Sequence, residues 1–112
     1  MPHVDTSRGE LFYAEKRGPA GGPELVLVHG AGGSHLHWPA QLRRLSRATV
    51  YSLDLPGHGR SRGPGCETIE AYVVALVAFL DGVGVDSAVI VGHSMGGAIA
   101  QQLSLTWPER VR

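Results

Sequence analysis

Residues 91–97 read Val-Gly-His-Ser-Met-Gly-Gly, and this stretch decides the fold of the chain. It follows an apolar run, residues 88–91, and precedes a helical pattern over residues 98–107. A Gly-x-Ser-x-Gly motif between a strand and a helix is typical of the nucleophile elbow, a sharp turn that exposes a serine hydroxyl. The motif predicts that Ser94 is a nucleophile at the carboxyl end of a strand, with a backbone φ above zero.

The residues around Ser94 suit so tight a turn. Gly92 and Gly96 are expected because a Cβ at either position would clash within it. His93 precedes the serine, and the turn should direct its side chain elsewhere. The helix that begins here presents free N–H groups and partial positive charge, so the N–H of Met95 can stabilise a developing oxyanion.

A second glycine-rich segment, His29-Gly30-Ala31-Gly32-Gly33, follows the apolar run Leu25–Val28. An apolar run without alternation predicts a strand that is covered on both faces. Where such a loop lies beside a nucleophile elbow, its backbone can donate a second N–H to the oxyanion. Ala31 is the expected donor, with Gly32 as the weaker alternative, and His29 and Gly30 shape the site. For the loop alone, a glycine-rich turn without a ligand is the other interpretation.

Strand-like and helical patterns alternate along the rest of the chain, which predicts an α/β fold with a mostly parallel sheet and flanking helices. The loop 54–61 after one strand reads Asp-Leu-Pro-Gly-His-Gly-Arg-Ser, and we interpret it as a structural floor of the site. Two further predictions concern strands: a hairpin of Val4–Thr6 with Leu11–Lys16, and a strand over Thr49–Leu53. A helix is also predicted, with Thr68 as its N-cap and an apolar stripe from Ile69 to Leu80. Gly82 and Gly84 are expected to end this helix.

Composition excludes several classes of function. Ten Lys and Arg balance ten Asp and Glu in 112 residues, which argues against a nucleic-acid partner. The longest apolar run, Ala71 to Leu80, is shorter than the ~20 residues of a membrane span. Cys66 is the only cysteine, and the N-terminus lacks the apolar core of a signal peptide, so a cytoplasmic location is expected.

The three motifs together resemble the α/β-hydrolase superfamily in its esterase, lipase, haloperoxidase-like and C–C hydrolase branch. They are His29-Gly30, residues 54–61 and residues 92–97, and the segment 107–111 resembles the family segment that leads into the next strand. The resemblance implies that Ser94 is the nucleophile and that Ala31 and Met95 form the oxyanion hole. It also implies that the strand ending at His29 is central in the sheet. Relatives with an aspartate nucleophile, such as epoxide hydrolases and haloalkane dehalogenases, do not fit a serine at position 94.

The resemblance covers only the N-terminal portion of such a domain, residues 1–112. The catalytic acid and histidine, the later strands and the cap have no counterpart, so the fold is expected to be incomplete and the chain inactive alone. Its substrate would be a small molecule with an ester, thioester, amide or activated C–C carbonyl group, attacked by Ser94 to give an acyl-enzyme. The apolar run 88–91 would be an unprotected edge strand through which the chain self-associates.

Other interpretations remain open at this point. One of the six histidines could act as the base. His93 is next to Ser94 in sequence, and His29 and His58 are expected in loops at the same edge of the sheet. We expect no cofactor and no metal, because His35 and His37 lack further ligands at suitable spacing and are expected to face solvent. A truncated, non-catalytic interaction module is the alternative function. A dinucleotide-binding domain is a third, since Gly30-x-Gly32 precedes Asp54 by a suitable distance, but His35 stands where a third glycine is needed.

Overall fold

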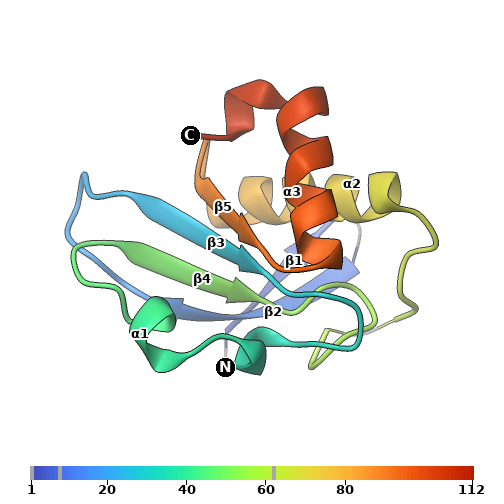
Figure 1. Cartoon of the computed structure of the whole chain (residues 1–112), viewed down its shortest axis with the longest axis horizontal. Helices are drawn as coiled ribbons and strands as arrows, with labels where there is room; N and C mark the ends of the chain where they lie inside the picture. Colours follow the sequence, from blue (N-terminus) through green and yellow to red (C-terminus); the bar gives the residue numbers. More distant parts are fainter. Residues whose placement is uncertain (1, 8, 62) are drawn as a thin grey trace.

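The computed structural model of the chain describes residues 2–7, 9–61 and 63–112. Within them one five-stranded sheet has the strand order β1-β2-β4-β3-β5 (Figure 1). The strands are β1 (His3–Thr6), β2 (Gly9–Lys16), β3 (Glu24–Val28), β4 (Thr49–Leu53) and β5 (Val89–Gly92). The helices are α1 (Ala40–Arg43), α2 (Ile69–Val83) and α3 (Met95–Thr106), with short 3₁₀ turns η1 (His35–His37) and η2 (Pro108–Arg110).

The strand β3 is central among the parallel strands, with β4 on one side and β5 on the other. This confirms the predicted order around the strand that ends before His29. The strands β1 and β2 form an antiparallel hairpin, and β2 joins β4 antiparallel, so the sheet is mixed. Because β3, β4 and β5 run in the same direction, the loops after all three leave from one edge of the sheet, where ligands bind in open α/β sheets.

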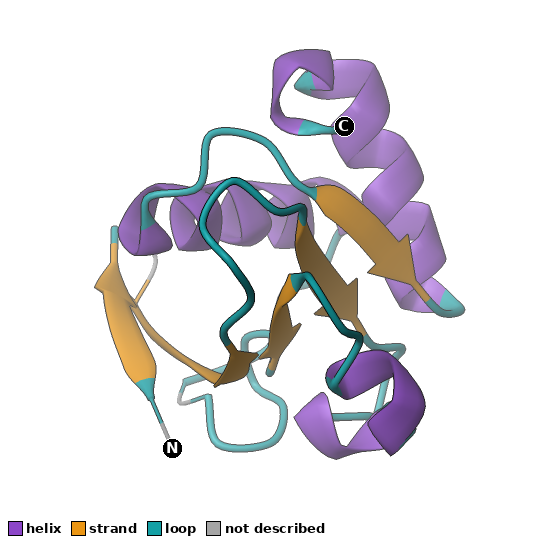
Figure 2. Ribbon diagram, turned by 90° about the vertical axis from the view of Figure 1, so that its left-hand side faces the viewer, coloured by secondary structure: helices purple, strands orange, loops and turns teal. Residues whose placement is uncertain are grey.

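Helices cover both faces of the sheet, with α2 and α3 on one side and α1 on the other (Figure 2). The side chains of β3 pack against helices on both faces of the sheet, which explains its continuous apolar sequence. Val26 and Val28 belong to the core cluster that includes Phe79 of α2, whereas Leu25 and Leu27 pack in a second cluster with Trp38. This two-sided packing positions the end of β3 firmly within the sheet.

The helix α2 begins and ends as its residues predict, with one exception. The side chain of Thr68 accepts a hydrogen bond from the Ala71 N–H at 3.1 Å, and Gly84 adopts the left-handed conformation with φ 76°. The expectation that Gly82 also ends the helix is wrong, because Gly82 lies within α2. A Cβ there would lie 2.7 Å from a methyl carbon of Val4, so this glycine lets β1 approach the helix.

The end of the chain lies beside β5. The Ala88 N–H donates to the Arg110 carbonyl oxygen at 3.0 Å, and Val111 forms a parallel bridge with Ala88. The segment 107–111, which resembles the family segment that leads into the next strand, therefore does approach the sheet. The expectation of an open edge over residues 88–91 is wrong for Ala88, which this bridge pairs. The side chains of Val89 to Val91 are only half-buried.

Candidate active site

Ser94 occupies the turn between β5 and α3, with φ 56° and ψ −117°. Positive φ is uncommon for a residue other than glycine and marks a constrained backbone. The predicted position and sign of φ are thus confirmed. The side chain of Ser94 makes no capping hydrogen bond to α3, and the residue is exposed. Among the residues that the structure describes, its hydroxyl forms no hydrogen bond, and it lies at the carboxyl edge of the sheet.

The glycines on either side of Ser94 permit the turn for steric reasons. A Cβ on Gly92 would clash with the carbonyl oxygen of Gly96, and a Cβ on Gly96 would clash with the carbonyl oxygen of Val28. The first contact lies within the elbow, and the second lies between the elbow and the central strand. Both glycines are therefore required by close backbone approach, as the sequence predicts.

The glycine-rich loop after β3 lies against the elbow. An ideal Cβ on Gly30 would be 3.2 Å from the Ser94 Cβ and 3.7 Å from the backbone nitrogen of Met95. The Gly33 N–H donates to the Gly30 carbonyl oxygen at 3.0 Å, which closes a turn with Ala31 at its first central position. Within the described residues, neither the Ala31 N–H nor the Met95 N–H donates a hydrogen bond to the protein.

His29 joins the loops after β3 and β4 and is fully buried. The Leu55 N–H donates to His29 Nε2 at 3.1 Å, and His29 Nδ1 lies 2.7 Å from the Gly30 carbonyl oxygen. Because Nε2 accepts, Nδ1 carries the proton and donates to Gly30. Burial is the main cause that lowers the pKa of His29; the hydrogen bond to Gly30 opposes this effect and the nearby His58 adds to it. This neutral imidazole positions the loop and has no free nitrogen with which to act as a base.

A buried carboxylate connects the same two loops. Asp54 accepts hydrogen bonds from the backbone N–H groups of His35 at 2.6 Å and Arg60 at 2.9 Å, and its carboxylate pairs with His35 Nδ1 at 2.9 Å. The structural interpretation of Asp54 is supported by this pattern. The expectation that His35 faces solvent is wrong, because its side chain is largely buried against Asp54. Sequence reasoning missed this pair, since nothing in a spacing of 19 residues indicates it.

The remaining histidines also have other partners. His58 Nδ1 donates to the Pro56 carbonyl oxygen at 3.0 Å, and the rings of His37 and His93 lie in tilted contact with centroids 4.6 Å apart. His3 pairs with Glu10 on the hairpin, at the far end of the strand order from β5. Among the described residues, no histidine nitrogen forms a hydrogen bond with the hydroxyl of Ser94.

The whole arrangement matches a known protein family. The family model described as alpha/beta hydrolase fold matches residues 23–112. The chain belongs to the α/β-hydrolase family. That match covers β3, the elbow and everything between them, so the resemblance seen in the three motifs is confirmed.

Individual α/β-hydrolase relatives carry diverse names. A dihydrolipoyllysine-residue acetyltransferase component of an acetoin cleaving system from Cupriavidus necator is 46% identical over 96% of this chain. Lipase LipV from Mycobacterium tuberculosis is 36% identical over 89% of the chain, and a bifunctional epoxide hydrolase 2 from Mus musculus is 38% identical over 81%. A solved hydrolase structure from Pseudomonas aeruginosa PA01 superposes with a TM-score of 0.85 at 33% identity over 99% of the chain.

The chain corresponds to only part of each relative. It spans 29% of the Cupriavidus protein, 38% of the lipase, 17% of the epoxide hydrolase and 43% of the Pseudomonas hydrolase chain. Among the described residues, no helix is both long and apolar enough to cross a membrane.

Proposed function

We propose that Ser94 is the nucleophile of a serine hydrolase that acts through an acyl-enzyme. The observation that carries the proposal is the strained backbone of Ser94, an exposed residue in a Gly-x-Ser-x-Gly turn between β5 and α3. A serine held in this conformation serves no capping or packing role in the turn, so its exposure is explained by chemistry. Ser94 Oγ would attack the carbonyl carbon of the substrate, and water would later hydrolyse the acyl group.

The N–H groups of Ala31 and Met95 are the proposed oxyanion donors. Support comes from the contact of the Gly30 backbone with the elbow and from the absence of protein acceptors for either N–H group within the described residues. Met95 is also the first residue of α3, where the partial positive charge of the helix favours an anion. In enzymes of this kind, loss of one such donor costs on the order of 10²–10³ in rate.

The base and the acid of the triad are proposed to come from residues outside this chain. Within the described residues, none of its histidine nitrogens forms a hydrogen bond with the hydroxyl of Ser94, and His29 is neutral and fully engaged. In the elbow order both partners follow the serine in sequence. The 112 residues alone should therefore hold the nucleophile in position without activating it.

The substrate class is a small molecule with an ester, thioester, amide or activated C–C carbonyl group. The relative named an acetyltransferase is consistent with a thioester or with an acyl acceptor other than water, since the same acyl-enzyme serves both outcomes. The serine at position 94 supports the serine branch over relatives with an aspartate nucleophile, such as epoxide hydrolases.

Dinucleotide binding is disfavoured by the state of Asp54. That mode requires an acidic side chain free to bind ribose hydroxyls, whereas the Asp54 carboxylate is fully buried and accepts three hydrogen-bond donors from His35 and Arg60. Titration of the chain with NAD is expected to show no binding. The other alternative, a non-catalytic interaction module, is separated from the hydrolase by the labelling experiment below.

The proposal is tested by supplying the missing partners. A chimera would carry residues 1–112 followed by the remainder of the Pseudomonas hydrolase chain, whose matched part shares the fold with a TM-score of 0.85. Fluorophosphonate should label the folded chimera rapidly, and mass spectrometry should place the adduct on Ser94. Ser94→Ala should abolish the labelling, whereas Ser104→Ala, on the exposed side of α3, should not. An adduct elsewhere, or one that survives Ser94→Ala, would contradict the proposal.

The 112-residue chain alone provides the complementary measurement. It should hydrolyse p-nitrophenyl acetate feebly or not at all, because an unassisted serine hydroxyl is a weak nucleophile at neutral pH. Turnover typical of an esterase that is lost on Ser94→Ala would show that a histidine of this chain acts as the base. Substitution of His29, His58 and His93 by alanine would then identify it.

A further inference from the structure

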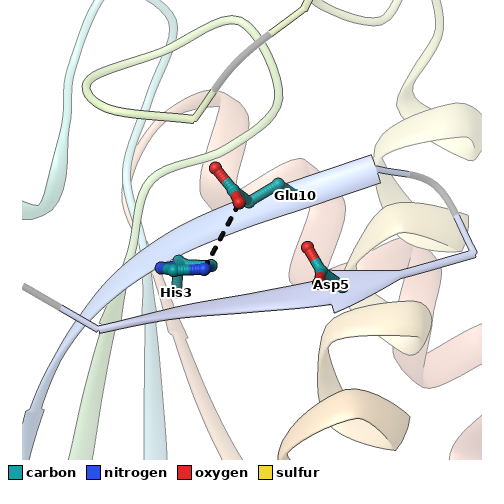
Figure 3. Close-up of side chains that lie close together, drawn as sticks. All are labelled: His3, Asp5 and Glu10. Atoms are coloured by element: carbon teal, nitrogen blue, oxygen red, sulfur yellow. Dashed lines mark ion pairs between the residues drawn. The ribbon is translucent and has the colours of Figure 1, made fainter.

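The hairpin of β1 and β2 brings three metal-binding side chains to one surface, far from Ser94 in the strand order (Figure 3). His3 and Asp5 are two residues apart on β1, so they share a face of the strand. Glu10 of β2 is the cross-strand partner of Asp5. The group therefore exists only in this register, and a shift by one residue would disperse it.

The distances suit a small divalent cation. His3 Nε2 lies 3.3 Å from Glu10 Oε2, and one ligand atom from each of the three residues lies within 4.8 Å of the others. Around a tetrahedral Zn²⁺ with bonds of about 2.1 Å, ligand atoms are about 3.4 Å apart. The His3–Glu10 pair already has this separation. Asp5 is exposed, so its side chain is free to rotate toward the other two ligands.

Packing on both faces of the hairpin holds in place the backbone that carries His3, Asp5 and Glu10. Val4 lies on the opposite face of β1, where it approaches Gly82 of α2. The imidazole of His3 lies against its cross-strand partner Phe12, with ring centroids 5.3 Å apart. The backbone that carries the three ligands is thus held on its inner face while the ligands remain accessible to solvent.

Charge also favours a cation at this position. Two carboxylates directly opposite each other on paired strands repel, and Asp5 and Glu10 occupy such positions. Among the residues that the structure describes, Asp5 forms no ion pair, and Glu10 pairs only with His3. A divalent cation would remove this repulsion and join both strands.

We propose that His3, Asp5 and Glu10 form a binding site for a late first-row divalent metal ion, with water completing the coordination. One imidazole and two carboxylates favour Zn²⁺ over Ca²⁺ or Mg²⁺, which prefer oxygen ligands alone. The site lies on the edge of the sheet opposite β5 and contributes no group to Ser94. Its role is to clamp the N-terminal hairpin against opening.

The test uses the chain without any affinity tag and Zn²⁺ as the probe. Isothermal titration should show one Zn²⁺ per chain, and His3→Ala or Glu10→Gln should each weaken the affinity at least about tenfold. Glu15→Gln is the matched control, because it makes the same charge change on the same strand outside the group. Zn²⁺ should raise the unfolding midpoint of the wild type and of Glu15→Gln, and should leave that of His3→Ala unchanged.

Co²⁺ absorption supplies a readout that does not depend on the association state of the chain. The d–d bands of a protein-bound ion should appear in the wild type and in Glu15→Gln, and should be absent from His3→Ala and Glu10→Gln. Far-UV circular dichroism should show that these surface substitutions leave the fold intact. The proposal is overturned if no binding occurs at millimolar metal, or if binding in both experiments persists unchanged in His3→Ala.

Discussion

The positive φ of Ser94 is imposed by the crowded turn in which the residue lies. The carbonyl oxygens of Val28 and Gly96 occupy the space that side chains at the flanking glycines would need. The strain at Ser94 is therefore maintained by the contact between the elbow and the central strand, and the position of the hydroxyl depends on that contact. The effect of this contact on stability can be measured by substituting the glycines separately.

Gly96→Ala is expected to destabilise the chain strongly, by about 3 kcal/mol, because the new Cβ would force the elbow away from β3. Gly97→Ala is the matched control in the same helix. The nearest atom to a Cβ there is 3.7 Å away, so the change should stabilise the chain by up to about 1 kcal/mol through helix propensity. Urea unfolding of both variants would check this, and equal effects at the two positions would contradict the steric account.

His29 should make the stability of the chain depend on pH. Its pKa is lowered in the folded state, chiefly by burial, so below about pH 6.5 the unfolded chain binds a proton that the folded chain does not. The free energy of unfolding should therefore fall as the pH falls from 7 to 5. One histidine can contribute a slope of at most about 1.4 kcal/mol per pH unit.

His29→Gln removes the titrating group and should reduce this slope. His3→Gln controls for the removal of an exposed histidine. Urea unfolding at several pH values gives the slopes directly. Identical slopes in the wild type and in His29→Gln would show that His29 does not control the response to acid.

At the scale of elements, the loops after β3 and β4 behave as one unit. His29 of the first loop receives a hydrogen bond from Leu55 of the second, and Asp54 of the second receives hydrogen bonds from His35 of the first, so each loop holds the other. The glycine-rich loop that supplies the proposed oxyanion donor is thus fixed by a neighbouring loop that performs no chemistry itself. The segment 54–61 therefore has a structural role beside the elbow, because it holds the glycine-rich loop in place.

Asp54→Ala should cost about 3 kcal/mol of stability, because it leaves two backbone N–H groups and the His35 ring without their buried acceptor. Asp86→Ala is the control, since that aspartate is exposed. Thermal unfolding would compare the two. A loss for Asp54→Ala no larger than for Asp86→Ala would mean that the two loops are not coupled through this carboxylate.

The sequence predicts local features well and long-range pairs poorly. The turn at Ser94, the cap at Thr68 and the apolar strand β3 follow from short patterns, because their causes lie within a few residues. Gly82 was misinterpreted, since its reason is the approach of Val4 from a distant strand. The contact between His35 and Asp54 and the grouping of His3 with Glu10 depend on tertiary placement and strand register, which composition and spacing do not encode.

At the scale of the whole molecule, the sheet separates two regions of different character. The carboxyl edge near β5 carries the proposed nucleophile, and the hairpin of β1 and β2 forms the opposite end of the strand order. Beyond the bridge at Ala88, the described residues give β5 hydrogen-bonded pairing only with β3. Val89 to Val91 therefore present unpaired backbone groups next to half-buried apolar side chains.

We expect the 112-residue chain, prepared alone, to self-associate through β5. Unpaired strand edges without charge or proline are templates for pairing with another chain. Val89→Lys would place a charge on this edge and should shift the chain towards monomer. Val74→Lys makes the same change on α2, at a residue that is 43% exposed, and should leave association unchanged.

Sedimentation equilibrium would measure the mass, and near-UV circular dichroism of Trp38 and Trp107 would report packing. A monodisperse wild-type monomer with sharp near-UV bands and a cooperative melt would refute the idea, as would association that Val89→Lys does not reduce.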